Sequence, residues 1–185
     1  MTEIQEKANT IPQELSIAEI RKYTKEAAPL IHCITNPISI HDCANIILAA
    51  GARPIMAEHP AEVAEITAVA SALMLNLGNI TDARIESIQR ALKEANRRKI
   101  PVLLDLVGVT CSSLRREFAR KLLADGRFAV IKGNISEILA AADLPFHGTG
   151  IDAGSQDAIS QANEARYCTT AKKLAEHLGC TVMAT

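Results

Sequence analysis

Six short apolar runs, separated by helical patterns, constrain the fold of this chain more than any other feature. Runs with so little polar alternation are typical of strands that are buried on both faces. Each run has four to six residues, and together they occupy Leu30–Ile34, Pro54–Ala57, Ala72–Leu77, Val102–Val107, Phe128–Ile131 and Cys180–Ala184. Because strands and helices alternate along the chain, the pattern predicts an α/β fold with a mostly parallel sheet covered by helices on both faces.

The helical patterns carry start and stop signals. Ser39 and Asp42 have the spacing of a capping box, and Gly51 stands where the C-cap of that helix is expected. Pro60 suits the first turn of the next helix. Residues 81–99 repeat apolar side chains at helical spacing and end on basic residues. The last helix is expected over residues 157–178, with Gly179 ending it.

Composition narrows the class of protein. The 185 residues carry a net charge of −1 and only 3% aromatic residues, so neither a nucleic-acid-binding protein nor a basic membrane-surface protein is favoured. No apolar run reaches the roughly 18 residues that a membrane-spanning helix needs. The polar N-terminus does not resemble a signal peptide, and five cysteines without framework spacing favour the cytoplasm. We expect a flexible arm over 1–14 and one α/β domain over 15–185.

Polar residues and glycines follow most of the predicted strands. In a parallel sheet, ligands bind beyond the carboxyl ends of the strands, so these positions are candidates for one shared crevice. Each position alone is equally well explained as a turn or a helix cap. The candidates, in chain order, are Asn36, Met56, Asn76, Gly78, Asp105, Lys132, Gly133, Asn134 and Thr185.

Motifs for several chemistries are missing, and one set of residues suggests magnesium. The chain has no dinucleotide fingerprint after a strand, no P-loop and no hydrolase elbow, and the GTGIDAG stretch at 148–154 is interpreted as a loop. Asp105 ends a strand, while Asn134 and Glu137 lie three apart at a predicted helix start. Carboxylate and amide oxygens suit hydrated Mg²⁺, which points to phosphoryl transfer. The spacing fits a simple helix cap by Glu137 equally well.

The histidines and cysteines between residues 32 and 43 do not form a convincing metal site or nucleophile. His32 and Cys33 are neighbours on a predicted strand and point to opposite faces. His41 and Cys43 diverge by about 200° around a helix of 3.6 residues per turn. A structural role, with the Asn36–Pro37 turn shaping a pocket wall, is therefore favoured over zinc binding or a Cys–His pair.

Five segments occur in the order and at the intervals seen in one enzyme family. They are LIHCITNPISIHDCANIILAAGARPIMA, ALMLNLGNI, VLLDLVGV, IKGNISEI and VMAT. From about Pro29 to Thr185, the chain resembles the hydroxyethylthiazole kinases, which are ribokinase-like enzymes. The resemblance implies that ATP phosphorylates the hydroxyl of 4-methyl-5-(2-hydroxyethyl)thiazole in thiamine biosynthesis or salvage, with Mg²⁺ as cofactor and a homotrimer with sites at subunit interfaces.

The resemblance also implies roles for particular residues. The position of Met56 matches thiazole binding, and Asn36 and Gly78 would line the same pocket. The positions of Asp105 and Glu137 would bind magnesium and phosphate. The positions of Lys132, Asn134 and Thr185 would contact ATP.

Several positions depart from the family pattern. Leu106 replaces the proline of the usual D-P-V-G, Lys132 replaces an arginine, Asn79 replaces a threonine, and VTCSSLR replaces a GATPFR-like loop in which Arg115 keeps the register. The family continues beyond the position of Thr185 with its glycine-rich anion hole and the group near the reacting hydroxyl, so we expect an incomplete domain whose catalytic residues lie beyond Thr185. Two alternatives stay open: a non-catalytic thiazole-binding relative, and a kinase of another small heterocyclic alcohol.

Overall fold

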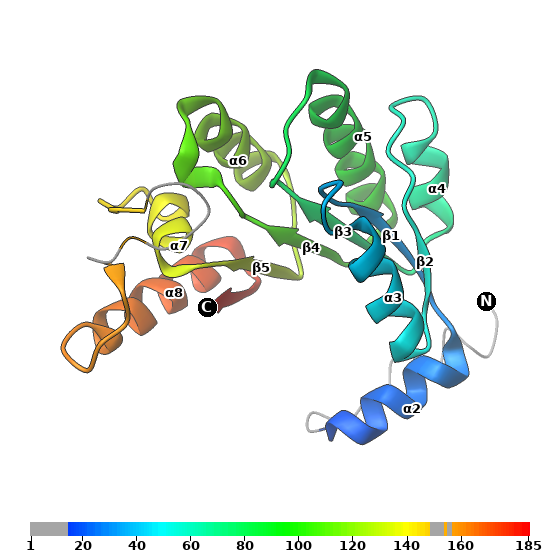
Figure 1. The fold of residues 1–185 in the computed structure, drawn as a ribbon, viewed down its shortest axis with the longest axis horizontal. Helices are drawn as coiled ribbons and strands as arrows, with labels where there is room; N and C mark the ends of the chain where they lie inside the picture. The colour runs from blue at the N-terminus through cyan, green and yellow to red at the C-terminus, as the bar shows by residue number, and fades with distance from the viewer. Residues whose placement is uncertain (1–14, 149–153, 155–156) are drawn as a thin grey trace.

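A parallel sheet forms the centre of the molecule (Figure 1). The computed structural model describes residues 15–148, 154 and 157–185, so the expected arm over 1–14 and most of the 148–154 loop lie outside the described residues. The described part has six parallel strands in the order β2-β1-β3-β4-β5-β6. Their bounds are Leu30–Ile34 (β1), Arg53–Ile55 (β2), Ala72–Asn76 (β3), Val102–Asp105 (β4), Val130–Gly133 (β5) and Thr181–Ala184 (β6). The prediction of a parallel α/β fold is confirmed.

Helices connect the strands along the chain. They span Ile17–Ala27 (α2), Ile40–Ala50 (α3), Val63–Val69 (α4), Asp82–Arg98 (α5), Ser113–Asp125 (α6), Ile135–Ala141 (α7) and Glu164–Leu178 (α8), with a 3₁₀ turn at Val109–Cys111 (η2). Gly51 and Gly179 end α3 and α8 with left-handed backbone angles, φ 95° and 63°, as predicted.

Two predicted helix starts and one predicted side-chain cap are wrong. Ser39 precedes α3 but makes no side-chain cap, because its hydroxyl lies 3.1 Å from that of Thr35 and 3.3 Å from the Asn36 carbonyl oxygen. Pro60 lies in a turn before α4. The last helix begins at Glu164, not at residue 157, because the Ser160 backbone N–H donates to the Asn163 side chain and closes a turn instead.

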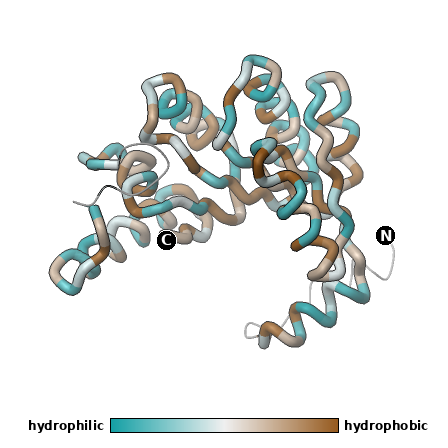
Figure 2. Tube along the Cα trace, in the orientation of Figure 1, coloured by the Kyte–Doolittle hydropathy of each residue, from teal (hydrophilic) through white to brown (hydrophobic). Residues whose placement is uncertain are grey.

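The core lies on one face of the sheet. Figure 1 shows α4, α5 and α6 along this face, and Figure 2 shows the hydrophobic residues concentrated in the strands and on the inner sides of these helices. Leu174 places α8 against the same core. The central side chains are fully or almost fully buried: Leu73, Leu75, Ile88, Leu92, Val102, Leu104, Leu122 and Ile131. Burying such aliphatic side chains contributes roughly 1.5–3 kcal/mol each.

The second face is covered less completely, although helices do lie on both faces as predicted. Figure 1 shows α3 there, beside β1 and β2. Strand register places Cys33, Met74, Leu103 and Val130 in one row across this face. Met74, Leu103 and Val130 are only half-buried, in contrast to their neighbours on the core face. Among the described residues, we find no helix that is both long and apolar enough to cross a bilayer.

Candidate active site

The predicted site residues lie in order along the carboxyl edge of the sheet. Met56 directly follows β2, and Thr185 directly follows β6 at the opposite end. Five strand spacings of about 4.8 Å separate the two outer strands by roughly 24 Å, which is too far for one small molecule to contact both ends. The edge therefore has two halves. The β2–β1–β3 half carries the predicted substrate residues, and the β4–β5–β6 half carries the predicted ATP and metal residues.

The connections of the sheet change direction at the boundary between β1 and β3. From β1 the chain moves outward to β2, then returns past β1 to β3 and continues in the other direction. In open α/β sheets such a switch point opens a crevice between the adjacent loops, and ligands bind there. Asn36 follows β1 and Gly78 follows β3, so both predicted substrate residues lie at the switch point.

Asn36 and Gly78 are close neighbours. The Asn36 side-chain oxygen accepts a hydrogen bond from the Ile38 backbone N–H at 2.9 Å, which fixes the turn before α3. A Cβ atom placed on Gly78 would lie only 2.9 Å from Asn36 Nδ2 and 2.8 Å from Asn76 Oδ1. Only glycine fits this position without displacing the two amides. The structure therefore brings together two of the residues that the sequence assigns to the thiazole pocket.

A row of side chains crosses the second face at the ends of β3, β4, β5 and β6. Strand register pairs Asn76 with Asp105, Asp105 with Lys132, and Lys132 with Met183. Lys132 Nζ lies 3.5 Å from Asp105 Oδ2, and the other Asp105 oxygen accepts from the Val107 backbone N–H at 3.1 Å. Lys132 belongs to β5, although the sequence places it after the strand. Because it is a strand residue, its side chain lies alongside Asp105 on the same face.

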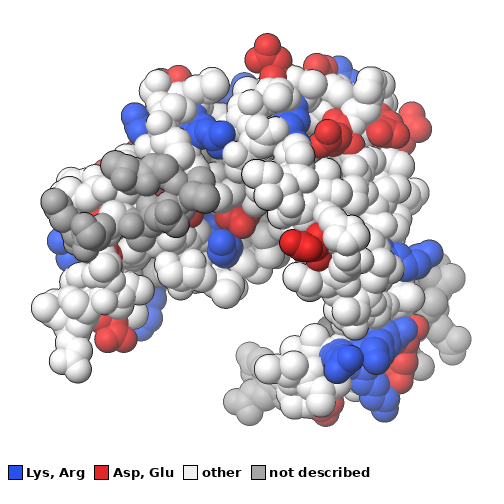
Figure 3. All heavy atoms as spheres, viewed as in Figure 1, with Lys and Arg blue, Asp and Glu red and all other residues white. Residues whose placement is uncertain are grey.

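Figure 3 shows the surroundings of this face. Acidic and basic side chains meet near the middle of the molecule, above a broad hollow between the α2–α3 end and the α8 end. Both members of the Asp105–Lys132 pair stay accessible, because 35% of the Lys132 side chain and 14% of the Asp105 side chain are exposed. Such a pair suits the binding of phosphate groups and their counter-ion.

Glu137 is a buried helix cap. Its Oε2 accepts from the Asn134 backbone N–H, its Oε1 accepts from the Gly108 backbone N–H, both at 2.8 Å, and the residue is 2% exposed. The Asn134 side chain completes the capping box of α7 by accepting from the Glu137 backbone N–H at 2.9 Å. Burial raises the pKa of Glu137; nearby Asp105 also raises it, while the backbone bonds and Lys132 act against the rise.

These donors fit a hydrated Mg²⁺ better than one held by protein alone. Within the described ranges, no three His, Cys, Asp or Glu side chains come together as a metal-binding cluster. Mg²⁺ commonly keeps several waters and is held by one or two carboxylates plus substrate phosphates. Asp105, whose Oδ2 lies 3.5 Å from Lys132 Nζ, fits that description. Both oxygens of Glu137 are occupied as cap acceptors, so a contact of Glu137 with the ion through a bound water stays a prediction.

His32 holds the loop after β2. The ring is completely buried, with Nε2 2.8 Å from the Ala57 carbonyl oxygen and Nδ1 2.8 Å from Thr67 Oγ1. Since a carbonyl only accepts, Nε2 carries the proton. Burial lowers the pKa of His32, which favours the neutral ring with Nδ1 accepting from the Thr67 hydroxyl. Ala57 follows Met56, so His32 fixes the backbone beside a predicted thiazole residue and has a structural role, as its position in the sequence suggested.

Two arginines make contacts with site loops that the sequence does not indicate, although Arg115 keeps the register of an arginine of the family pattern. Arg115, in the first turn of α6, donates to the carbonyl oxygens of Leu77 and, at 3.2 Å, of Gly78. Arg84, in the first turn of α5, donates to the Thr35 carbonyl oxygen and pairs with a glutamate of the loop after β2. Their partners lie 26 to 49 residues away along the chain, so no local spacing pattern indicates these contacts.

Comparisons with known proteins agree with this geometry. A family model described as the hydroxyethylthiazole kinase family matches residues 21–185. Hydroxyethylthiazole kinase 2 of Clostridium botulinum type Ba4 is 51% identical over 167 residues, which are 90% of this chain and 63% of that protein. The hydroxyethylthiazole kinase of Clostridium beijerinckii is 39% identical over 92% of this chain and 61% of its own length. The chain therefore spans somewhat less than two thirds of these curated relatives.

A solved structure shares the fold. The hydroxyethylthiazole kinase protein of Pyrococcus horikoshii OT3 superposes with a TM-score of 0.76 at 29% identity, over 90% of this chain and 59% of that chain. The match of the family model covers most of the chain, and the shared fold agrees with it. The chain belongs to the hydroxyethylthiazole kinase family.

Proposed function

We propose that the protein transfers the γ-phosphoryl group of ATP to the hydroxyl of 4-methyl-5-(2-hydroxyethyl)thiazole in thiamine salvage, in the cytoplasm. The observation that carries the proposal is the division of the sheet edge, in a chain of this family, into an Asn36–Gly78 half and an Asp105–Lys132 half. A kinase has to hold an alcohol and a nucleotide next to each other. Neighbouring halves of one edge provide that arrangement.

The residues of the two halves would have different tasks. Asn36, Gly78 and Met56 would hold the thiazole alcohol at the switch point between β1 and β3. Lys132 would contact the phosphates of ATP, and Asn134 and Thr185 would lie at the same end of the sheet, where the Thr185 backbone N–H donates to the Gly133 carbonyl oxygen. Asp105 would hold Mg²⁺, which supplies charge stabilisation to the phosphates when bound.

The transfer needs no reactant besides the alcohol and ATP. A bond forms between the alcohol oxygen and the γ-phosphorus, the bond from the γ-phosphorus to the β–γ bridging oxygen breaks, and ADP leaves with the electron pair. The proton of the hydroxyl is released. Catalysis of such a transfer is mostly positioning and charge stabilisation. The Asp105–Lys132 pair would contribute to both in the nucleotide half, together with the catalytic residues that the resemblance implies beyond Thr185.

The direct test is ADP formation by the product of the whole gene. We expect ADP to appear only when ATP, Mg²⁺ and the thiazole alcohol are all present. Lys132→Ala should weaken ATP binding at least tenfold, because a charge-assisted phosphate contact contributes roughly 1.5–3 kcal/mol. Lys93→Ala, which removes a lysine of α5, is the control and should leave ATP binding unchanged.

Two other results would replace the proposal. Thiazole binding without any ADP would identify a non-catalytic relative. ADP formation with a different heterocyclic alcohol, at a higher kcat/KM than with the thiazole alcohol, would identify another substrate.

A further inference from the structure

Arg84 connects the loop after β1 with the loop after β2. Its guanidinium donates to the carbonyl oxygen of Thr35, the residue before Asn36. The same group pairs with the Glu58 carboxylate, with Nη1 3.0 Å from Oε2. Glu58 lies two residues after Met56. One side chain thus holds the two loops that carry the predicted thiazole residues.

A second side chain of α5 supports the same loop. Ser87 lies one turn after Arg84 and is completely buried. Its Oγ lies 2.7 Å from the Glu58 carbonyl oxygen and 2.8 Å from the Ala83 carbonyl oxygen. Together with the bond from His32 to the Ala57 carbonyl oxygen, both residues that follow Met56 are held by buried side chains.

Stability alone does not account for Arg84. The residue is 4% exposed, and its Nε is fully buried without a hydrogen-bond partner among the residues that the structure describes. A buried charge that is incompletely satisfied costs free energy, and a well-packed apolar side chain in its place is often neutral or stabilising. The carboxylate that pairs with it is 46% exposed, so the pair is not sealed inside the core. What Arg84 adds is a fixed spacing between two loops.

We propose that Arg84, with Glu58 as its counter-ion and Ser87 as a second support, is a positioning residue that sets the distance between Asn36 and Met56 and thereby the affinity for the alcohol substrate. The inference rests on the proposed function, because it takes the pocket at the switch point to be the thiazole site. Arg84 need not touch the alcohol. It acts through the Thr35 carbonyl on one side and the Glu58 carboxylate on the other.

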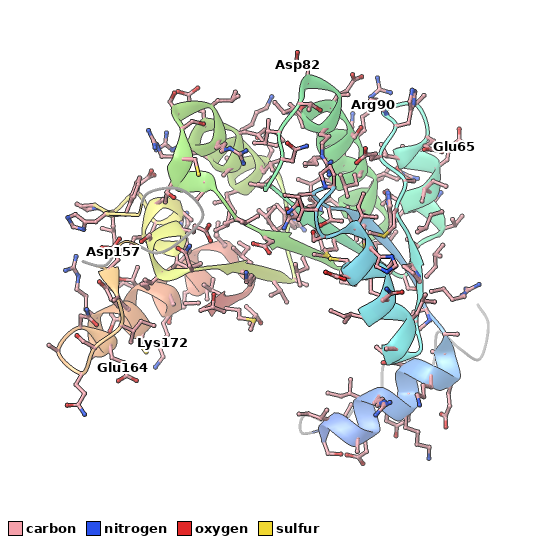
Figure 4. All side chains as sticks on the ribbon, in the orientation of Figure 1. Glu65, Asp82, Arg90, Asp157, Glu164 and Lys172 are labelled. Atoms are coloured by element: carbon pink, nitrogen blue, oxygen red, sulfur yellow. The ribbon has the colours of Figure 1, made fainter. Side chains whose placement is uncertain are left out.

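Two glutamates, each paired with an arginine of α5, provide a matched test of the proposal. Glu58→Ala removes the partner of Arg84, while Glu86→Ala removes the partner of Arg90, an exposed pair at 2.6 Å on the same helix. Figure 4 shows Arg90 among the side chains at the outer end of the molecule. Both variants delete one carboxylate and one ion pair with an arginine. Arg84→Lys, which keeps the charge but loses the planar fork, serves as a second variant of the positioning group.

Two measurements test these variants, and the second, an NMR measurement, needs no ligand. The dissociation constant of the thiazole alcohol is measured by calorimetry, and the position of the Met56 loop by the ε-methyl NMR signal of Met56. We expect Glu58→Ala to weaken thiazole binding about tenfold, because small displacements of positioning groups are costly. It should also move the Met56 signal while ADP binding stays constant. Glu86→Ala should change none of these.

The outcomes separate this inference from the function. If the wild type binds the thiazole alcohol and Glu58→Ala binds it equally well with an unmoved Met56 signal, the positioning role is wrong and the function stands. If the wild type does not bind the thiazole alcohol, the proposed function is wrong, and the Met56 signal alone decides about the positioning role. A purely stabilising role of Arg84 would lower the Tm of Arg84→Lys and leave affinity and the Met56 signal of the folded protein unchanged.

Discussion

At the scale of single residues, Glu137 connects the start of α7 with the loop after β4. Its carboxylate caps α7 through the Asn134 N–H and holds the loop after β4 through the Gly108 N–H. Gly108 has a φ of 77°, a conformation that glycine adopts at little cost. The residue therefore fixes the backbone on both sides of the Asp105–Lys132 pair, whatever its role toward Mg²⁺. This structural task follows from the capping-box spacing, whereas the bond to Gly108, 29 residues away, does not.

The Glu137→Gln variant tests the buried carboxylate. Glutamine keeps one acceptor oxygen and turns an NH₂ group toward the other backbone N–H, which leaves a buried donor unpaired and costs about 1–3 kcal/mol. Since the folded-state pKa of Glu137 is raised, the folded protein binds the proton more tightly than the unfolded chain does. The stability of the wild type should therefore fall as the pH rises from the ordinary glutamate pKa of 4.5 through the higher folded pKa. Urea unfolding between pH 4 and pH 8 measures both effects, and an unchanged pH slope in the variant would contradict the assignment.

Gly78→Ala tests the thiazole half of the site. The new methyl carbon would lie under 3.0 Å from the amides of Asn36 and Asn76, so both side chains have to move. We expect thiazole binding to weaken at least tenfold, with a loss in Tm of a few degrees and unchanged ADP affinity. Calorimetry with each ligand separates the two affinities. Equal losses for the thiazole alcohol and ADP would mean that Gly78 does not belong to the substrate half alone.

At the scale of elements, the same capping box has different consequences in two helices. Ser16 and Glu19 form a capping box on α2, and Asn134 and Glu137 form one on α7. No side chain of α2 is buried, whereas most of α7 is. Isolated helices of this length are marginal in water, so α2 depends on its cap and α7 depends on its packing as well.

Ser16→Ala and Asn134→Ala make this difference measurable. Each removes an N-cap that contributes about 1 kcal/mol. We expect Ser16→Ala to speed amide exchange in α2 about fivefold without changing the Tm, because α2 opens independently of the core. Asn134→Ala should lower the Tm, since α7 is part of the cooperative unit. A lower Tm in Ser16→Ala would show that α2 packs more firmly than its exposure indicates.

The elements also show how far the sequence predicts this molecule. The α5 helix is predicted to within a residue, because its apolar period and its basic last turn agree. The start of α8 is missed because the Asn163 side-chain oxygen accepts a hydrogen bond from the Ser160 backbone N–H, which competes with helix formation. Asn36, Gly78, Asp105 and Lys132 are predicted at one edge of the sheet because each lies at or just after the carboxyl end of a predicted parallel strand. Arg84 and His32 are not predicted to hold site loops, because burial and partners distant in sequence decide their roles.

At the scale of the whole molecule, the exposed apolar side chains are concentrated near one end. Ile20 and Tyr23 of α2 and Ile46 and Leu48 of α3 are all at least half exposed, and the two helices contact each other. Figure 1 shows this pair at the N-terminal end, away from α6 and α8. Ile46 and Leu48 are two residues apart and lie on opposite flanks of α3, so exposed apolar side chains flank this helix pair on more than one side. Exposed apolar surface of this kind marks an interaction surface. Because the resemblance implies a homotrimer with sites at subunit interfaces, we propose the α2–α3 surface as the contact between copies.

Charge substitutions on this surface test the assembly. We expect the wild type to sediment at about three times the mass of its own polypeptide chain, and Ile46→Lys or Leu48→Lys to shift it toward the monomer, because a lysine in an apolar contact has to be desolvated. Val69→Lys is the matched control: Val69 is 70% exposed, as Ile46 is at 69%, but it lies on α4, on the other face of the sheet. The control should sediment like the wild type. A monomeric wild type would refute the trimer, and equal dissociation by Val69→Lys would refute the assignment of the α2–α3 surface.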